Sequence, residues 1–146
     1  MKKLLCVLFA GMLLLSGCSE PEEKTAVCKV EMDGMSEQIT LTALDDEVLS
    51  MKSVMQLPYS LYDIVTDEEK AMFESQMLEN FATSGIQVES KSTEDVFVLE
   101  MNMNFAEVNY QDLVNLGMMS ESDLDSEMIS LQKTLDGLTS SGYTCE

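Results

Sequence analysis

The chain has 146 residues, eight lysines, 27 acidic residues, no histidine and no tryptophan, which gives a formal net charge of −19. Without arginine or a lysine cluster to neutralise phosphates, nucleic-acid partners are excluded. Without histidine, Ser–His and Cys–His catalysis and histidine-ligated zinc are excluded. We therefore expect a protein without catalytic residues, bound metal or cofactor.

The first 18 residues predict a secretory leader. Lysines at positions 2 and 3 precede an uncharged 12-residue run, Leu4 to Leu15, too short for an ordinary membrane span. Leu15-Ser16-Gly17-Cys18 then resembles the lipobox of bacterial lipoprotein precursors. The resemblance implies that residues 1–17 are a lipoprotein signal peptide and that Cys18 carries the lipid. An ordinary signal peptide with a chance cysteine, or an uncleaved anchor helix, are the alternatives.

Lipidation of Cys18 would hold the protein on the membrane or cell envelope, at the extracytoplasmic face, because two or three acyl chains anchor stably. Residues 18–25 form the lipidated cysteine and a short polar linker, and residues 26–146 a single domain. Loss of the leader leaves six lysines against 27 acidic residues, a net charge of −21. That charge keeps the domain soluble and would favour cationic partners.

Alternating apolar residues predict three strands at the start of the domain. The first runs over 26–32 and ends at the turn signal Asp33-Gly34; the second covers 38–43 and ends at Asp45-Asp46. A third strand begins at Leu49 and fades before Pro58.

A helix is predicted over 67–83. Thr66 and Glu69 have the spacing of a capping box, and Phe73, Met77 and their neighbours form an apolar stripe. Gly85 stands at the expected C′ position of this helix.

The remaining elements complete a mixed pattern. We expect a strand over 86–90, the longest strand over 97–105, a short helix over 109–116 and a last strand over 143–145. An apolar seam with helical spacing predicts the final helix, which Gly142 ends. This seam consists of Leu124, Met128, Leu131, Leu135 and Leu138. The order predicts a two-layer α+β domain with an antiparallel sheet and two main amphipathic helices packed on one face. The other sheet face would be polar.

Cys28 and Cys145 are the two thiols left once Cys18 is acylated, and they lie in the first and last predicted strands. Outside the cytoplasm a disulfide between them would persist. It requires those two strands to be neighbours, with Cα atoms within about 7 Å. Two free thiols are the alternative. A redox-catalytic pair is disfavoured because no Cys-x-x-Cys motif is present.

Two patterns suggest metal ligands, and each has a plainer interpretation. Asp123-x-Asp125-x-Glu127 is partly similar to a calcium loop but lacks its glycine, so we interpret it as a solvated acidic helix start. The methionines could bind Cu(I), but their positions place them on core faces. These are Met32, Met51, Met55, Met77, Met101, Met103 and Met128. Met118-Met119, in a predicted loop, instead suggests an exposed contact surface.

Taken together, the chain resembles the YehR-like bacterial lipoproteins, a family with no established biochemical activity. The resemblance extends from the lipobox through the domain. Its carriers there are Asp46-Glu47-Val48-Leu49, the run from Glu100-Met101 to Leu113 around Val108-Asn109-Tyr110, and Ser141-Gly142-Tyr143. It implies a small α+β domain with helices on one sheet face and supplies no catalytic residues.

The sequence thus predicts a membrane-anchored binding or interaction module whose partner is an unidentified protein or small ligand. One alternative is an envelope lipoprotein that binds cations with its acidic surface. A more remote alternative is a hydrolase that uses a pair of carboxylates.

Overall fold

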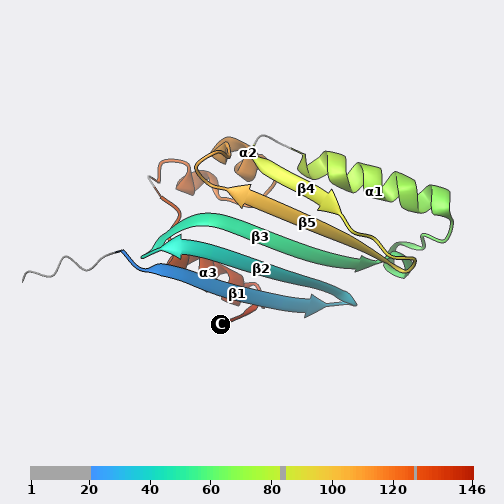
Figure 1. Ribbon diagram of the computed structural model, residues 1–146, viewed down its shortest axis with the longest axis horizontal. Helices are drawn as coiled ribbons and strands as arrows, with labels where there is room; N and C mark the ends of the chain where they lie inside the picture. The colour runs from blue at the N-terminus through green and yellow to red at the C-terminus, as the bar shows by residue number, and fades with distance from the viewer. Residues whose placement is uncertain (1–20, 83–84, 127) are drawn as a thin grey trace, which may run out of the picture.

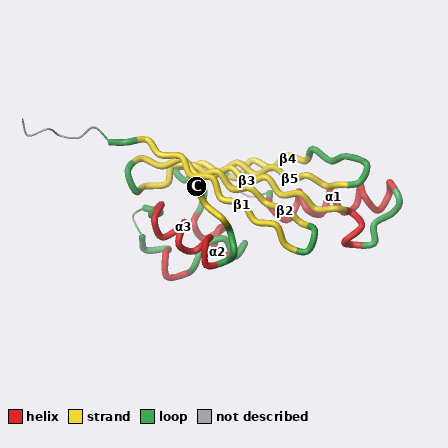
Figure 2. Tube along the Cα trace, turned by 90° about the horizontal axis from the view of Figure 1, so that it is seen from below, coloured by secondary structure: helices red, strands yellow, loops and turns green. Residues whose placement is uncertain are grey.

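The computed structural model describes residues 21–82, 85–126 and 128–146. They form a six-stranded antiparallel sheet in the order β4-β5-β3-β2-β1-β6 (Figure 1). The helices α1, α2 and α3 all lie on one face of this sheet (Figure 2). The predicted two-layer α+β class is therefore confirmed. Within the described residues, no helix has the length and apolar character needed to cross a membrane.

Two tight turns make the first three strands a meander. Strand β1 (Glu23–Met32) joins β2 (Met35–Leu44), which joins β3 (Glu47–Pro58). Left-handed φ angles of 50° at Asp33 and 87° at Gly34 match a hairpin turn of the type that Asp-Gly favours. Because β1 begins at Glu23, the predicted linker is three residues too long. Its last three residues already pair with β2.

The next two strands extend the sheet beyond β3. Strand β5 (Val96–Asn104) pairs with β3 on one side and with β4 (Ile86–Ser90) on the other. The expectation that this strand is the longest is wrong, since β3 has 12 residues and β5 has nine. Strand β3 hydrogen-bonds to a neighbour on both sides, and this pairing keeps it extended as far as Pro58.

Helix α1 (Asp67–Phe81) returns the chain from β3 to β4. Its capping box is present, with Glu69 N donating to Thr66 Oγ1 and Thr66 N donating to Glu69 Oε2. The helix ends two residues before the predicted position, and its C-cap is Ala82, so the assignment of Gly85 as C′ is wrong. Gly85 instead has a φ of 81° in the turn that enters β4.

The C-terminal part contains α2 (Tyr110–Asn115), the short 3₁₀ helix η2 (Glu121–Asp123), α3 (Leu131–Ser140) and β6 (Thr144–Cys145). The prediction that one helix spans the whole seam from Leu124 is wrong, because α3 begins only at Leu131. Immediately before it, Val48 N donates to the carbonyl of Ile129. This bond holds the chain extended beside β3 and delays the helix. Gly142 follows the C-cap, as predicted.

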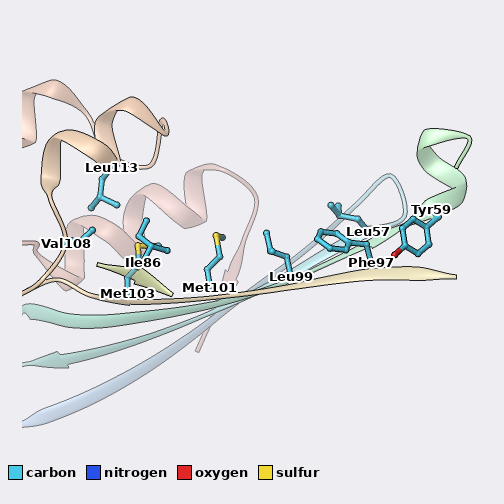
Figure 3. Packing of buried hydrophobic residues seen from close by; sticks show 9 residues of the cluster. All are labelled: Leu57, Tyr59, Ile86, Phe97, Leu99, Met101, Met103, Val108 and Leu113. Atoms are coloured by element: carbon cyan, nitrogen blue, oxygen red, sulfur yellow. The ribbon is translucent and has the colours of Figure 1, made fainter. Parts of the chain in front are cut away.

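Two hydrophobic cores lie between the sheet and the helices. The first lies beneath α1 and α2. Figure 3 shows its buried side chains: Leu57, Tyr59, Ile86, Phe97, Leu99, Met101, Met103, Val108 and Leu113. The second is beneath α3 and contains Ala26, Cys28, Ile39, Leu41, Ala43, Val48 and Leu131. The core positions of Met101 and Met103 are confirmed. Those of Met32 and Met128 are wrong, because these side chains are 54% and 40% exposed.

The opposite sheet face is polar, as predicted. On it the Lys91 ammonium lies 2.8 Å from a carboxylate oxygen of Glu100, and that of Lys52 lies 3.6 Å from the same oxygen. The hydrogen bond from Lys91 lowers the pKa of Glu100 below its usual range. Both cores and all six strands lie within residues 21–146, which therefore contain the elements of an independent folding unit.

Candidate functional site

An open groove lies between α3 and the segment that leads from α2 to α3. Its volume is about 350 Å³, within the range of small-molecule sites. The apolar part of its lining consists of Met118, Met119, Met128, Ile129 and Leu138. The rest consists of Ser120, Asp123, Ser126, Ser130, Lys133, Thr134 and Gly137.

One wall of the groove follows a sharp turn after α2. Gly117, with a φ of 72°, reverses the chain, and Met118 N donates to the carbonyl of Leu113. Met118 is 37% exposed, whereas Met119 is half-buried against the first core. The expected exposure of the Met118-Met119 pair is therefore correct for its first member. The flexible thioether chains give this wall an adaptable apolar lining.

The start of α3 is fixed by a carboxylate on the β2–β3 turn. Asp46 accepts hydrogen bonds from Ser130 Oγ at 2.7 Å and from Gln132 N at 2.9 Å. These two donors favour the charged carboxylate, and they hold the pKa of Asp46 below its usual range, the Gln132 amide contributing most. Ser130 also caps the helix by accepting from Lys133 N. The position of the groove wall thus depends on a residue 84 positions earlier.

The end of α3 is fixed by the last strand. Strand β6 pairs with β1, so the first and last strands are neighbours. A disulfide joins Cys28 to Cys145, their Cα atoms 4.0 Å apart, and the Cys28 side chain is fully buried. Residues 27 and 146 also exchange two backbone hydrogen bonds. Helix α3 is therefore held to the sheet at both ends.

Gly137 lies inside α3, on the groove. A Cβ atom built there would meet no heavy atom within 4 Å, so packing does not require glycine at this position. Glycine inside a helix costs about 0.5–1 kcal/mol relative to alanine. Gly137 therefore destabilises the helix, and its structural effect is that no side chain projects from the helix backbone into the groove at this position.

Opposite charges line the groove at Lys133 and Asp123. Within the described part of the chain, no carboxylate lies within ion-pair distance of the exposed Lys133 ammonium. Of the predicted acidic pattern, Asp123 lines the groove and Glu127 lies outside the described residues. No three residues among Asp, Glu, Cys and His lie close enough to hold a metal ion in the part of the chain that the structure describes.

A polar cluster that the sequence patterns did not predict lies on the helix-facing side of the sheet. Glu37 accepts hydrogen bonds from Ser53 Oγ at 2.6 Å and from the Tyr143 hydroxyl. Burial, with the Glu37 carboxylate beside the phenol, raises the pKa of Tyr143 well above its usual range. Period-two alternation with Ile39 and Leu41 was the available signal, because it places Glu37 on their face. The cluster ties the C-terminal segment to β2 and β3.

The predicted lipidation site, Cys18, lies outside the described residues, as does the leader that precedes it. The described features define a class: a single α+β domain with an antiparallel sheet, helices on one face and an open groove beside the last helix. Residues 24–144 match the model of a family of unknown function, DUF1307. The chain belongs to this family.

Two solved structures share the fold. The NMR structure of the Escherichia coli YehR protein has a TM-score of 0.71 and 16% identity, covering 86% of this chain and 91% of YehR. The NMR structure of a protein from Streptococcus pneumoniae TIGR4 has a TM-score of 0.56 and 17% identity, covering 100% of this chain and 98% of that protein. The YehR-like resemblance is thereby confirmed. No curated protein matches this chain significantly.

Proposed function

We propose that this protein is a lipid-anchored, extracytoplasmic binding module whose groove beside α3 takes a small ligand with an apolar body and an anionic group. The observation that carries the proposal is Gly137. A helix-interior glycine without an internal packing role is explained if a ligand approaches the helix backbone at that point.

The lining supports this ligand class. Methionine and aliphatic side chains favour an apolar body of variable shape. The exposed ammonium of Lys133 favours an anionic group, in a protein whose overall charge repels anions. The groove volume, about 350 Å³, suits a ligand of small-molecule size.

The position of the groove supports a ligand found near a membrane surface. Glu22 hydrogen-bonds to Asp45, in the same turn that caps α3 through Asp46. The groove therefore lies toward the end of the sheet where the chain enters from residue 18. Four residues between Cys18 and β1 span at most about 14 Å.

A dye-binding experiment on residues 21–146 tests the groove. Anilinonaphthalene sulfonate is apolar and anionic, and we expect saturable binding with enhanced fluorescence. Gly137→Leu places a side chain in the groove and should weaken binding by about tenfold or more. Ser140→Leu adds the same side chain to α3 outside the groove lining and is the matched control. If both variants weaken binding equally, or neither does, the proposal is wrong.

The charge requirement is tested separately. Lys133→Gln should weaken dye binding about two- to fivefold, as expected for an exposed charge pair, without affecting the neutral dye Nile red. Lys29→Gln removes the same charge from the exposed face of β1 and should leave binding unchanged. An equal loss with both variants would show only a response to net charge.

The lipid anchor is tested by fractionation of the full chain. Cys18→Ala should move the protein from the membrane fraction to the soluble fraction, while Cys6→Ala should not. Globomycin, which blocks lipoprotein signal cleavage, should cause the unprocessed precursor to accumulate. Membrane association that survives Cys18→Ala would refute the anchor without bearing on the groove.

A further inference from the structure

Exposed apolar side chains gather at the end of the sheet farthest from the chain's entry point. We call Met32, Leu61, Tyr62 and Val65 the distal patch; they are 54%, 45%, 47% and 78% exposed. They come from the end of β1 and from the segment that contains the 3₁₀ helix η1 (Tyr59–Tyr62). Figure 1 shows the β1–β2 turn and the start of α1 at this end, opposite the end of the sheet at which β1 begins.

Contacts between these elements make the distal patch a fixed surface. A Cβ atom at Gly34 would lie 3.7 Å from the Leu61 side chain, so Leu61 covers the β1–β2 turn. The Tyr62 hydroxyl lies 3.7 Å from the sulfur of Met35, and its ring centroid lies 5.1 Å from that of Phe73 on α1. The turn, η1 and α1 thus support one another at this end.

The distal patch adjoins an acidic hollow. Asp63, Glu94 and Asp95 contribute to its lining, together with Val65 of the patch. Lys70 is the one cation among the described lining residues. Its ammonium donates to the backbone carbonyl of Glu94 at 2.7 Å and lies 5.3 Å from the centroid of the Tyr59 ring. The Glu94 carbonyl, the Tyr59 ring face and the Asp67 carboxylate, 4.0 Å away, thus surround this ammonium, while three acidic residues line the hollow.

We propose that the distal patch and the adjoining hollow bind a basic amphipathic segment of another protein. The partner's apolar side chains would cover Leu61, Tyr62 and Val65, and its lysine or arginine side chains would enter the hollow beside Asp63 and Asp95. Charge complementarity selects this occupant. A second copy of this chain would bring equally acidic surfaces together and be repelled. The site is separate from the α3 groove, because β1 alone places about 33 Å between the two ends.

Peptide binding to residues 21–146 tests this proposal. The probe is a synthetic helical peptide of leucine and lysine with its leucines on one face, and the reference peptide has serine in place of each leucine. We expect one saturable site for the leucine peptide and an affinity at least about tenfold lower for the serine peptide. Equal affinity for both peptides would show that the interaction depends on net charge alone and not on the apolar side chains, and this would overturn the proposal.

Variants locate the site. Leu61→Ser and Tyr62→Ser should each weaken the leucine peptide about tenfold, whereas Leu49→Ser, an exposed leucine of β3 outside the patch, should change its affinity less than about twofold. Because these side chains are exposed, circular dichroism should show that the variants fold. Equal losses with Leu49→Ser would overturn the assignment.

Charge variants and sedimentation complete the test. Asp63→Asn and Asp95→Asn should weaken the peptide more than Asp136→Asn, which removes an equal charge from α3. The Asn variant suits position 63, where φ is 54°, since asparagine tolerates this conformation. Sedimentation equilibrium should show a monomer. A dimer that Leu61→Ser dissociates would assign the distal patch to self-association instead.

Discussion

The bridge between Cys28 and Cys145 gives a sharp stability prediction. The two residues are 117 positions apart, so the disulfide closes a loop across most of the domain. In the chain-entropy relation, a loop of about 118 residues lowers the free energy of folding by about 5 kcal/mol at 25 °C. That value is comparable to the whole stability of many small domains.

Urea denaturation of residues 21–146, with and without reductant, measures this contribution. Cys28 and Cys145 are the only cysteines in this segment. Reduction should lower the unfolding free energy by about 5 kcal/mol, or unfold the domain outright. The Cys28→Ala, Cys145→Ala double variant should be insensitive to reductant, which controls for other effects of the reagent.

Intact mass after alkylation checks the bond itself. Without reduction neither thiol should be labelled, and with reduction both should be. Labelling of both thiols in the unreduced protein would show that the bond is absent. An unfolding midpoint that reductant does not move would refute the predicted entropic contribution of the bond to stability. Hydrogen exchange would then show whether β6 stays paired with β1 through its backbone bonds alone.

Three other changes have outcomes fixed by local geometry. Gly85→Ala should lower the free energy of unfolding by more than about 2 kcal/mol, because the added Cβ would lie 2.5 Å from the Val108 Cα. Gly117 also has a positive φ, but a Cβ there would meet no heavy atom within 4 Å, so Gly117→Ala should lower the free energy of unfolding by only about 1–2 kcal/mol. Thermal melts measure both losses. Thr66→Ala should cost about 1 kcal/mol in urea denaturation through loss of the α1 cap, and a smaller effect would show that the cap is not needed. Because folding raises the pKa of Tyr143, its contribution to stability is complete below pH 10 and is lost as the pH rises through the folded pKa. Between neutral and strongly alkaline pH, the free energy of unfolding of Tyr143→Phe should therefore fall less than that of the wild type. Spectrophotometric titration at the phenolate band should show that the variant has one fewer tyrosine that titrates late.

Local signals in the sequence predicted much of the fold. The Asp33-Gly34 turn, the capping box at Thr66 and the alternation over 86–90 depend on neighbours in the chain, so they can be read directly. The α+β class followed from the order of these elements. The start of α3 did not follow, because the apolar seam has helical spacing from Leu124 onward. What delays the helix is the pairing of residues 129–130 with β3 and the capping by Asp46, contacts between distant segments.

The candidate site was predicted only in fragments. The sequence indicated that Met118-Met119 lies in a loop as a candidate contact surface. The opposite wall of the groove is formed by α3, and its position depends on where that helix begins. Gly137 carries a signal of its own, because an isolated glycine inside an amphipathic helix indicates a packing or functional role. The distal patch required the tertiary structure, because Met32 and Leu61 come from segments about 30 residues apart and only the hairpin geometry brings them to one end.

The covalent link between the first and last strands also determines how the molecule responds to cutting and to force. A protease that nicks any loop between residues 28 and 145 leaves two fragments joined through sulfur, so neither is released. When the chain is pulled between its two termini, the tension passes from β1 through this bond to the C-terminus. It can straighten only the residues before position 28 and cannot unravel the closed ring of chain behind them.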